Sequence, residues 1–451
     1  MDGRSAHEAQ GGVYTVTQFD LEGIFRKLES RGFEQIALES SESTMEQLRF
    51  SHNTKDLYNI WREKDLGIFA SVGDKSASTV VKDESRIDES IDKLWSVCHK
   101  IPGNQSFSGL NPNKQKFGNQ FKGKWKEYDL QDLSLALING SLSNGAERTA
   151  GVIYNRYHVV SIKTNYNQCT FETGGVEAVI RSFKGETTGQ EGRHFGLACD
   201  LDASTLEAMG RDSALPLTLP DTEKTINPGK FRVIMAPYVI GNLISYSSGF
   251  LSYYSVESGL SCFSESLGKK VSDENFTLVD DPLDYEGTNA RVCDDEGTAT
   301  RKNVLIENGI LKGFMHSHST ASRANTTSTG NAGIISPKAW QMKILPGKVT
   351  FDEMLSDLDE GLLINNCWYT RYQDYRNGIF STVPRDGVFY VKNGEIQGSV
   401  RGIRISDSIP SILRNITAVS REVKNVKWWE EISASTMPYV LVNDVNLSKA
   451  F

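Results

Sequence analysis

Apolar and polar positions follow two different periods along the first half of the chain. Apolar residues at helical spacing predict helices over 19–30, 87–98, 130–142 and 202–211. Period-two patterns between them predict short strands over 35–38, 45–50, 57–62, 66–72, 76–81, 149–154, 158–164 and 169–183. Helices that alternate with groups of antiparallel strands predict an α+β fold, in which helices cover one face of an antiparallel sheet.

The second half is dominated by predicted strands. Asn-Gly pairs at 308–309 and 393–394 supply the two positive φ angles of a type I′ turn, so they predict hairpins over 304–314 and 388–400. Further strands are expected at 232–236 and 439–443. This pattern favours a β-rich, barrel- or sandwich-like C-terminal domain.

Three helices interrupt these strands. An apolar stretch rich in small residues predicts one over 240–254, just after a Pro-Tyr turn. Thr350 and Glu353 form a capping box at the start of the second. Pro410 stands in the first turn of the third, expected over 408–419, where its missing N–H is harmless.

The 451 residues exceed one ordinary hydrophobic core, so two domains are expected. Residues 216–229 hold three of the twelve prolines and are the best inter-domain linker. We therefore predict a disordered polar tail over 1–12, an N-terminal α+β domain over 13–222 and a C-terminal β-rich domain over 223–451.

Charge and composition exclude several classes of partner. The net charge of −8 comes with no stripe of lysine and arginine, which argues against nucleic acid. No apolar run approaches the roughly 18 residues needed to cross a bilayer, so no membrane association is expected. The polar N-terminus lacks the apolar core of a secretory signal. Six scattered cysteines without a CxxC pair predict reduced, mostly buried thiols and a cytoplasmic protein.

Two closely spaced histidines, His316 and His318, are a weak candidate for a metal site. On a strand they would share one face, yet two ligands do not complete a zinc site. Aspartates occur in pairs at 280–281 and 294–295, each in a turn-like sequence. Turn chemistry is the simpler explanation for both pairs, because Asp accepts hydrogen bonds from its own backbone.

Several blocks together resemble the TldD/PmbA (TldE) family of peptidase-related proteins. They are DDP at 280–282, DDEG at 294–297, VLIENGILKG at 304–313, STGNAG at 328–333, WYTR at 368–371, PRDGVFYVKNGEI at 384–396 and VRGIRI at 400–405. The similarity covers most of the second half and, more weakly, the order of elements in the first.

The resemblance implies where a zinc site would stand. In the catalytic TldD branch an HExxxH helix supplies two zinc-binding histidines and a general-base glutamate, and a later cysteine is the third ligand. Laid over this chain, the motif falls on Ser245, Tyr246 and Phe250, and no cysteine follows Cys367. Phenylalanine has no lone pair, and a serine or tyrosine hydroxyl is a poor zinc ligand at neutral pH. The departure matches the PmbA/TldE branch.

The resemblance therefore implies a subunit of a TldD/TldE-type metallopeptidase, inactive alone and without its own zinc. Zinc is expected in a catalytic TldD-like homologue, with which the chain would form a heteromer, or it would pair with itself as a homodimer. Small or unfolded peptides would be the substrates. Cleft or partner candidates are Asp280, Asp281, Asp294, Asp295, His316, Ser328, Thr329, Gly330, Asn331, Trp368 and Arg371.

Two other functions remain open. A non-enzymatic peptide-binding or scaffold protein would have no catalytic homologue as partner. A hydrolase with a different site would need a Ser, His and Asp set; Ser245 or Ser247 with His316 is conceivable, but no nucleophile-elbow sequence surrounds either serine.

Overall fold

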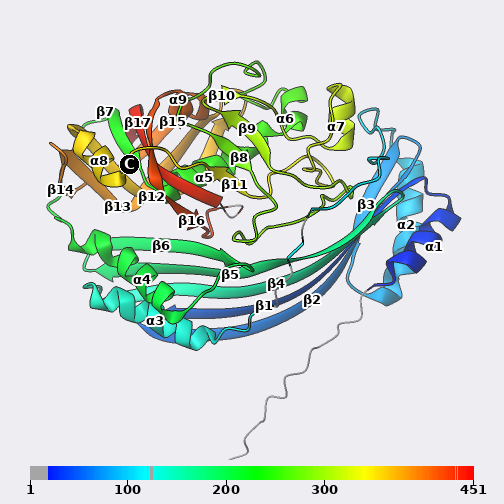
Figure 1. The fold of residues 1–451 in the computed structure, drawn as a ribbon, viewed down its shortest axis with the longest axis horizontal. Coiled ribbons are helices and arrows are strands. Elements are labelled where there is room, and N and C mark those ends of the chain that lie inside the picture. Colours follow the sequence, from blue (N-terminus) through cyan, green and yellow to red (C-terminus); the bar gives the residue numbers. More distant parts are fainter. Residues whose placement is uncertain (1–18, 119, 122–124, 432, 434, 451) are drawn as a thin grey trace, which may run out of the picture.

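The computed structural model describes residues 19–118, 120–121, 125–431, 433 and 435–450. Its first half is a long, curved antiparallel sheet, and its second half is a β-rich body seated over the concave face of that sheet (Figure 1). The mixed α+β class predicted from the sequence is confirmed. The predicted tail over 1–12 lies outside the described residues.

The N-terminal sheet has the strand order β3–β2–β1–β4–β5–β6, with every neighbouring pair antiparallel. Helices α1 and α2 pack at one end of the sheet, while α3 and α4 cover its outer face at the other end (Figure 1). The elements are α1 Leu21–Arg31, β1 Gln35–Ser51, β2 Thr54–Val72, β3 Lys75–Val81, η1 Glu84–Arg86, α2 Ile87–Lys100, α3 Leu130–Ser143, β4 Arg148–Thr164, β5 Gln168–Lys184, β6 Thr187–Gly196, α4 Ala203–Ala214 and η2 Leu215–Thr218.

The strands of this sheet are longer than the sequence predicts. The segments expected at 35–38 and 45–50 are both part of β1, and those at 57–62 and 66–72 are both part of β2. Polar residues such as those at 39–44 interrupt the apolar alternation, but they stay paired with β4 because the sheet is extended beyond its apolar core. Strand β6 was missed altogether, since its sequence TTGQEGRHFG is polar and rich in glycine.

The C-terminal half contains a closed ring of paired strands. The ring runs β7–β12–β13–β15–β17 and returns to β7, with β7 and β12 parallel and the other pairs antiparallel. The predicted barrel-like character is thus present. The elements are β7 Gly229–Met235, α5 Pro237–Ser247, η3 Ser248–Leu251, α6 Tyr253–Glu257, β8 Leu278–Asp280, β9 Asn303–Glu307, β10 Ile310–Leu311, α7 His318–Arg323, β11 Met342–Ile344, α8 Phe351–Asp357, β12 Glu360–Asp374, β13 Ile379–Lys392, β14 Glu395–Ser399, β15 Ile403–Ser408, α9 Ile409–Arg414, β16 Ile416–Val426 and β17 Ser435–Lys449.

Local turn and cap signals were the most accurate predictions in this half. Asn308 and Gly309 both have positive φ, 49° and 76°, at the tip of the β9–β10 hairpin, as a type I′ turn requires. The capping box of Thr350 and Glu353 begins α8. Helix ends were predicted less well, because α9 stops at Arg414 and the chain turns directly into β16, five residues earlier than expected.

A buried ionic network joins the two halves. Glu191 on β6 accepts hydrogen bonds from the hydroxyl of Tyr238 on α5, from Lys424 Nζ on β16 at 2.7 Å and from Arg193 Nε at 3.0 Å. The two cations and this hydroxyl outweigh the effect of burial and lower the pKa of Glu191. The body is thereby fixed against the sheet, and the cleft between them has a defined shape.

None of the helices in the described part of the chain is both long and apolar enough to cross a membrane.

Candidate functional site

A cleft of about 460 Å³ lies between the concave face of the sheet and the C-terminal body. Glu39 of β1 and Thr173 of β5 line it from the sheet side. From the body come Ser248 and Gly249, directly after α5, and Arg291, Lys338, Trp340 and Ser433. The cleft is thus bounded by two regions, one next to the degenerate zinc motif and one next to the second aspartate pair.

The degenerate motif positions are structural contacts in this fold. The Ser245 hydroxyl accepts a hydrogen bond from the backbone N–H of Ser433 at 3.3 Å. The Tyr246 hydroxyl donates to Glu430 Oε2 at 3.3 Å. Phe250 is buried and packs edge-to-face on Tyr372, with ring centroids 4.9 Å apart. We call residues 245–250 the motif segment.

The helix that carries this segment is shorter than predicted. Helix α5 begins at Pro237 and ends at Ser247, and the chain then passes through the 3-10 turn η3 into the short α6. The helix was expected over 240–254. It ends before Phe250 instead, because the chain leaves the α-helical hydrogen-bond pattern at Ser248 and Gly249. Phe250 points into the main core of the body, whereas Tyr246 reaches Glu430.

The donor set at the motif segment does not fit zinc. A phenyl ring offers no ligand atom, and the two hydroxyls are poor ligands at neutral pH. Among the residues that the structure describes, no group of three or more His, Cys, Asp or Glu side chains is placed to hold a metal ion. No catalytic step through a metal can be derived from these side chains.

The second wall of the cleft is supported by a carboxylate cluster, which we define as Asp280, Asp294, Asp295 and Glu296. Asp280 is fully buried at the end of β8. Its Oδ1 accepts the backbone N–H of Trp340 at 2.9 Å and that of Gln341 at 2.7 Å, and its Oδ2 accepts Asn331 Nδ2 at 2.6 Å. Burial nevertheless raises the pKa of Asp280 to about 6.

Asp294 plays the same part in the neighbouring loop. It is fully buried and accepts backbone N–H groups from Glu296 at 3.0 Å, Thr298 at 2.8 Å and Ala332 at 2.9 Å. Burial raises its pKa to about 7, and burial together with the charge of Asp294 raises the pKa of Glu296 to about 8. The turn chemistry expected for the aspartate pairs is therefore present at Asp294, which accepts from N–H groups of its own loop, whereas Asp280 accepts only from groups distant in the sequence.

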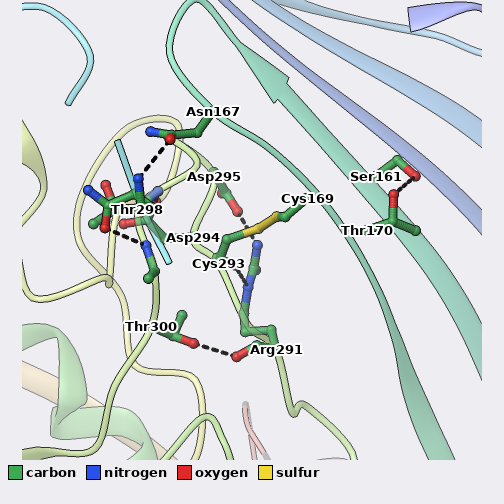
Figure 2. The surroundings of a disulfide bond; sticks show 12 residues. Ser161, Asn167, Cys169, Thr170, Arg291, Cys293, Asp294, Asp295, Thr298 and Thr300 are labelled. Atoms are coloured by element: carbon green, nitrogen blue, oxygen red, sulfur yellow. Dashed lines mark hydrogen bonds and ion pairs between the residues drawn. A yellow bond between two sulfur atoms is a disulfide. The ribbon is translucent and has the colours of Figure 1, made fainter. Parts of the chain in front are cut away.

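The second member of each aspartate pair meets cations instead. Asp281 lies 3.7 Å from Lys302 Nζ. Asp295 forms ion pairs with Arg291 Nη2 at 2.9 Å and Lys338 Nζ at 3.2 Å (the Arg291 contact is drawn in Figure 2). Both cations also lie over the ring of Trp340, Arg291 at 3.8 Å from its centroid and Lys338 at 4.8 Å.

Glu39 completes the charged lining of the cleft. Burial and the charge of Asp295 raise its pKa, and Arg291 and Lys338 act in the opposite direction. The cleft therefore presents one carboxyl group from the sheet opposite two cations and an indole from the body. These groups can bind a polar, extended ligand by hydrogen bonds and charge, but they do not form a nucleophile–base pair.

The segment 328–331 is a tightly bonded part of the body. Asn331 is fully buried and satisfies all its polar atoms, donating to Asp280 and Lys338 O and accepting from Asn303 and Thr329. Ser328 donates its hydroxyl to the carbonyl of His316 at 3.2 Å. Gly330 has φ +73°, and a Cβ there would lie 2.5 Å from the Ala299 carbonyl oxygen, so only glycine fits.

The two histidines do not share the face of a strand. His316 precedes α7, while His318 is its first residue, and its backbone N–H donates to Glu296 Oε2 at 2.9 Å. His316 is buried with its ring 4.6 Å from that of Tyr253, and burial lowers its pKa to about 4. The strand geometry on which the weak metal hypothesis rested is absent at these positions.

Trp368 and Arg371 lie near the motif segment, on β12. Trp368 is buried against Trp428 and donates its indole N–H to Asp386 at 2.9 Å, as a core tryptophan does. Between them the strand bulges, and Tyr369 takes φ +60° with its N–H directed at Glu430 Oε2, 3.3 Å away. The Glu430 carboxylate thus links α5 to β12 by accepting hydrogen bonds from both. Apart from the two tryptophans before it, nothing in the sequence around Glu430 points to this role.

The expectation of six reduced thiols is wrong for two of them. Cys169 on β5 and Cys293 beside the carboxylate cluster form a disulfide across 124 residues of sequence (Figure 2). Cys98, Cys199, Cys262 and Cys367 are free. The pair was missed because only the folded sheet brings β5 against the 293–297 loop; no spacing in the sequence signals it.

Comparisons with known proteins relate the second half of the chain to a peptidase family. Residues 228–449 match the family model of the PmbA/TldA metallopeptidase C-terminal domain. A metalloprotease of Methanocaldococcus jannaschii is 32% identical over 200 residues, which cover 43% of this chain and 44% of that protein. Metalloprotease PmbA of Escherichia coli O157:H7 is 27% identical over 232 residues, which cover 49% of this chain and 48% of PmbA. The aligned regions thus span less than half the length of these curated relatives.

A solved structure extends the likeness to nearly the whole fold. TldE from Thermococcus kodakarensis superposes with a TM-score of 0.80 over 95% of this chain and 99% of its own, at 20% sequence identity. At that identity the likeness concerns the fold alone.

Proposed function

The chain belongs, through residues 228–449, to the PmbA/TldD metallopeptidase family, and from that premise we propose that it is a TldE-like subunit that assists proteolysis by a zinc-bearing homologue. In this proposal the chain holds no zinc of its own. The metal and the catalytic step belong to the partner, and this chain supplies part of the chamber in which a small or unfolded peptide is held.

One observation carries the proposal. The positions that correspond to the family's two histidines and glutamate are Ser245, Tyr246 and Phe250, and each is engaged in a structural contact of the body. A subunit that keeps the family's fold but lacks ligand atoms at these positions needs a second protein for metal-dependent hydrolysis.

The cleft supports the peptide part of the proposal. Its polar and charged lining from Glu39, Arg291 and Lys338 suits the amide groups and termini of an extended peptide. Trp340 offers a flat apolar surface between the two cations. A cytoplasmic location is included in the proposal, although the Cys169–Cys293 disulfide is of a kind that is rare in cytosolic proteins.

The direct test is a reconstitution. The purified chain and a zinc-bearing homologue from the same cell are assayed for peptidase activity separately and mixed, and complex formation is followed by light scattering after gel filtration. We expect a stable heteromer whose activity exceeds that of the homologue alone, with no activity from this chain. Binding of peptides without such a heteromer would favour the non-enzymatic peptide-binding function, and hydrolysis by this chain alone would point to a different site.

A substitution at Gly249 tests whether the cleft takes part. A Cβ at Gly249 meets no atom within 4 Å and its φ is not in the left-handed region, so a side chain can start there, and Gly249→Trp adds a bulky ring to the lining of the cleft. We expect the mixture to lose about tenfold in activity, equivalent to about 1.4 kcal/mol. Gly313→Trp is the matched control, because Gly313 has the same freedom and does not line the cleft. Equal activity of the two variants would exclude the cleft from the reaction.

A further inference from the structure

The wall of the cleft that the C-terminal body provides carries more positive than negative charge. Arg291 and Lys338 both line the cleft, and both form their ion pairs with one carboxylate, Asp295. A single carboxylate cannot neutralise two cations, so an excess of positive charge remains on this wall. An anionic group of a ligand would compensate for it.

The other carboxyl groups near the cleft offset this charge only in part. Glu39 stands on the opposite wall, and burial together with the charge of Asp295 raises its pKa, which favours its uncharged form. Asp280, Asp294 and Glu296 are not among the residues that line the cleft. Burial raises their pKa values to about 6, about 7 and about 8, so a negative charge is disfavoured on each of them. The cations therefore dominate the surface that a ligand meets on this wall.

Lys338 is the cation that can reach a ligand. Its side chain is 52% exposed, against 12% for that of Arg291. An ammonium group has three N–H donors, and the hydrogen bond from Lys338 Nζ to Asp295 at 3.2 Å uses one of them. Asn331 fixes the backbone of Lys338, because it accepts the Lys338 N–H and donates to the Lys338 carbonyl, each at 2.9 Å. The ammonium group is thus held at the cleft with two donors left for a ligand.

Two polar side chains that line the cleft with Lys338 can donate to the same ligand. The Asn289 side chain is exposed, while its backbone N–H is fixed by a hydrogen bond to Gln341 Oε1 at 3.2 Å. Ser336 is half-buried in the loop that leads to Lys338. Within the described part of the chain, neither the Asn289 carboxamide nor the Ser336 hydroxyl has a hydrogen-bond partner. Each supplies an N–H or O–H donor that a carboxylate can accept.

We infer that the cleft binds a carboxylate of its peptide ligand, which accepts hydrogen bonds from Lys338 Nζ and from the side chains of Asn289 and Ser336. The inference rests on the proposed function, because it names the substrate class of the same cleft. That class is peptides with a free C-terminal carboxylate or an acidic side chain. Charge-assisted hydrogen bonds are about twice as strong as neutral ones, so the carboxylate selects among peptides that the rest of the cleft accepts alike.

Four peptides that differ from one another by a single group test this preference. The parent is a short peptide of alanine and leucine with an asparagine in the middle, an uncharged fluorophore at the N-terminus and an amidated C-terminus. One derivative has a free C-terminal carboxylate, one has aspartate in place of the asparagine, and one has lysine there. Their binding to the purified chain alone is measured by fluorescence anisotropy at low and at high salt.

At least one of the two acidic peptides should bind about tenfold tighter than the parent, and high salt should reduce this advantage. Tighter binding of the C-terminal acid identifies the terminal carboxylate as the bound group, and tighter binding of the aspartate peptide identifies an acidic side chain. Equal affinities, a preference for the lysine peptide, or no binding of any peptide would overturn the inference. The assay contains no homologue, so its failure is distinguishable from failure of the reconstitution.

A matched pair of lysine variants assigns the preference to Lys338. Lys338→Gln removes the ammonium charge and should abolish the advantage of the acidic peptide. Lys302→Gln should retain it, because Lys302 is similarly exposed, at 48%, also lies near one aspartate and does not line the cleft. Lys338→Glu should reverse the order and favour the lysine peptide, a change that a purely structural lysine would not produce. An advantage that persists in Lys338→Gln, or that both glutamine variants lose equally, would contradict the assignment.

Discussion

The two walls of the cleft are built from opposite kinds of interaction. The motif segment, residues 245–250, contacts its surroundings through hydroxyl hydrogen bonds, among them two of 3.3 Å, and through the buried ring of Phe250. The carboxylate cluster consists of buried carboxyl groups, and Asp280 and Asp294 each accept three hydrogen bonds from loop and strand groups around them.

This difference distinguishes two roles that a polar or acidic sequence motif can have, one in ligand binding and one in holding the fold together. The resemblance to the family puts metal ligands at the motif segment, but the side chains of this chain there make hydrogen bonds and apolar contacts within the fold. In the carboxylate cluster the aspartates organise loops that have no regular secondary structure. Removal of a cluster aspartate should therefore damage the fold, whereas changes at the motif segment should be mild.

The largest expected effect is at Asp280. Asp280→Ala leaves the buried N–H groups of Trp340 and Gln341 and the Asn331 amide without their acceptor, at a cost of about 1–3 kcal/mol for each unsatisfied group. We expect the free energy of unfolding to fall by about 3 kcal/mol or more in denaturant titrations. Asp281→Ala is the control, since its 3.7 Å ion pair with Lys302 should be worth less than about 1 kcal/mol. Equal losses would remove the distinction between the two residues.

The disulfide should contribute the next largest effect. It joins β5 of the sheet to the loop that begins the carboxylate cluster, so the double variant Cys169→Ser/Cys293→Ser lengthens the free chain of the unfolded state. We expect a loss of about 2–4 kcal/mol under non-reducing conditions. With a thiol reductant present, wild type and variant should unfold at the same denaturant concentration. If the variant still unfolds at a lower concentration, the serine side chains and not the missing disulfide cause the loss of stability.

A pH dependence should follow from the cluster. Burial raises the pKa of Asp294 to about 7 and that of Glu296 to about 8, so the folded state holds protons that the unfolded state releases. The free energy of unfolding should therefore decrease as pH rises from about 4.5 to about 8. Glu296→Gln cannot titrate and should show a shallower decrease over that interval. A steeper decrease in the variant would contradict the assignment of the proton to this cluster.

The smallest expected effect is at the motif segment. Tyr246→Phe removes one hydrogen bond of 3.3 Å to Glu430 and should cost about 1 kcal/mol or less. The same denaturant titration gives the value. A loss as large as that of Asp280→Ala would mean that the two walls are equally structural.

The fold could be predicted from the sequence where local chemistry decides the conformation. The Asn-Gly hairpins and the capping box at Thr350 need only neighbouring residues, and both are present. The length of β1 and β2, the existence of β6 and the Cys169–Cys293 pair depend on tertiary contacts, so no local pattern revealed them.

The candidate site was predictable in its chemistry but not in its geometry. The resemblance places the family's ligand positions on Ser245, Tyr246 and Phe250, and residue type alone indicates that these side chains are poor zinc ligands; that placement stays a prediction. The cleft residues Glu39, Arg291, Lys338 and Trp340 went unrecognised, because the sheet and the body that bring them together are far apart in sequence.

The zinc content of the purified chain tests the central claim most directly. After expression with added zinc and exhaustive buffer exchange, metal analysis is made on the chain alone and on a zinc-bearing homologue treated identically. The account predicts far less than one zinc per chain here, and one per chain in the homologue. One zinc per chain that is removed only by a chelator would contradict it and would require ligands other than the side chains of the motif segment.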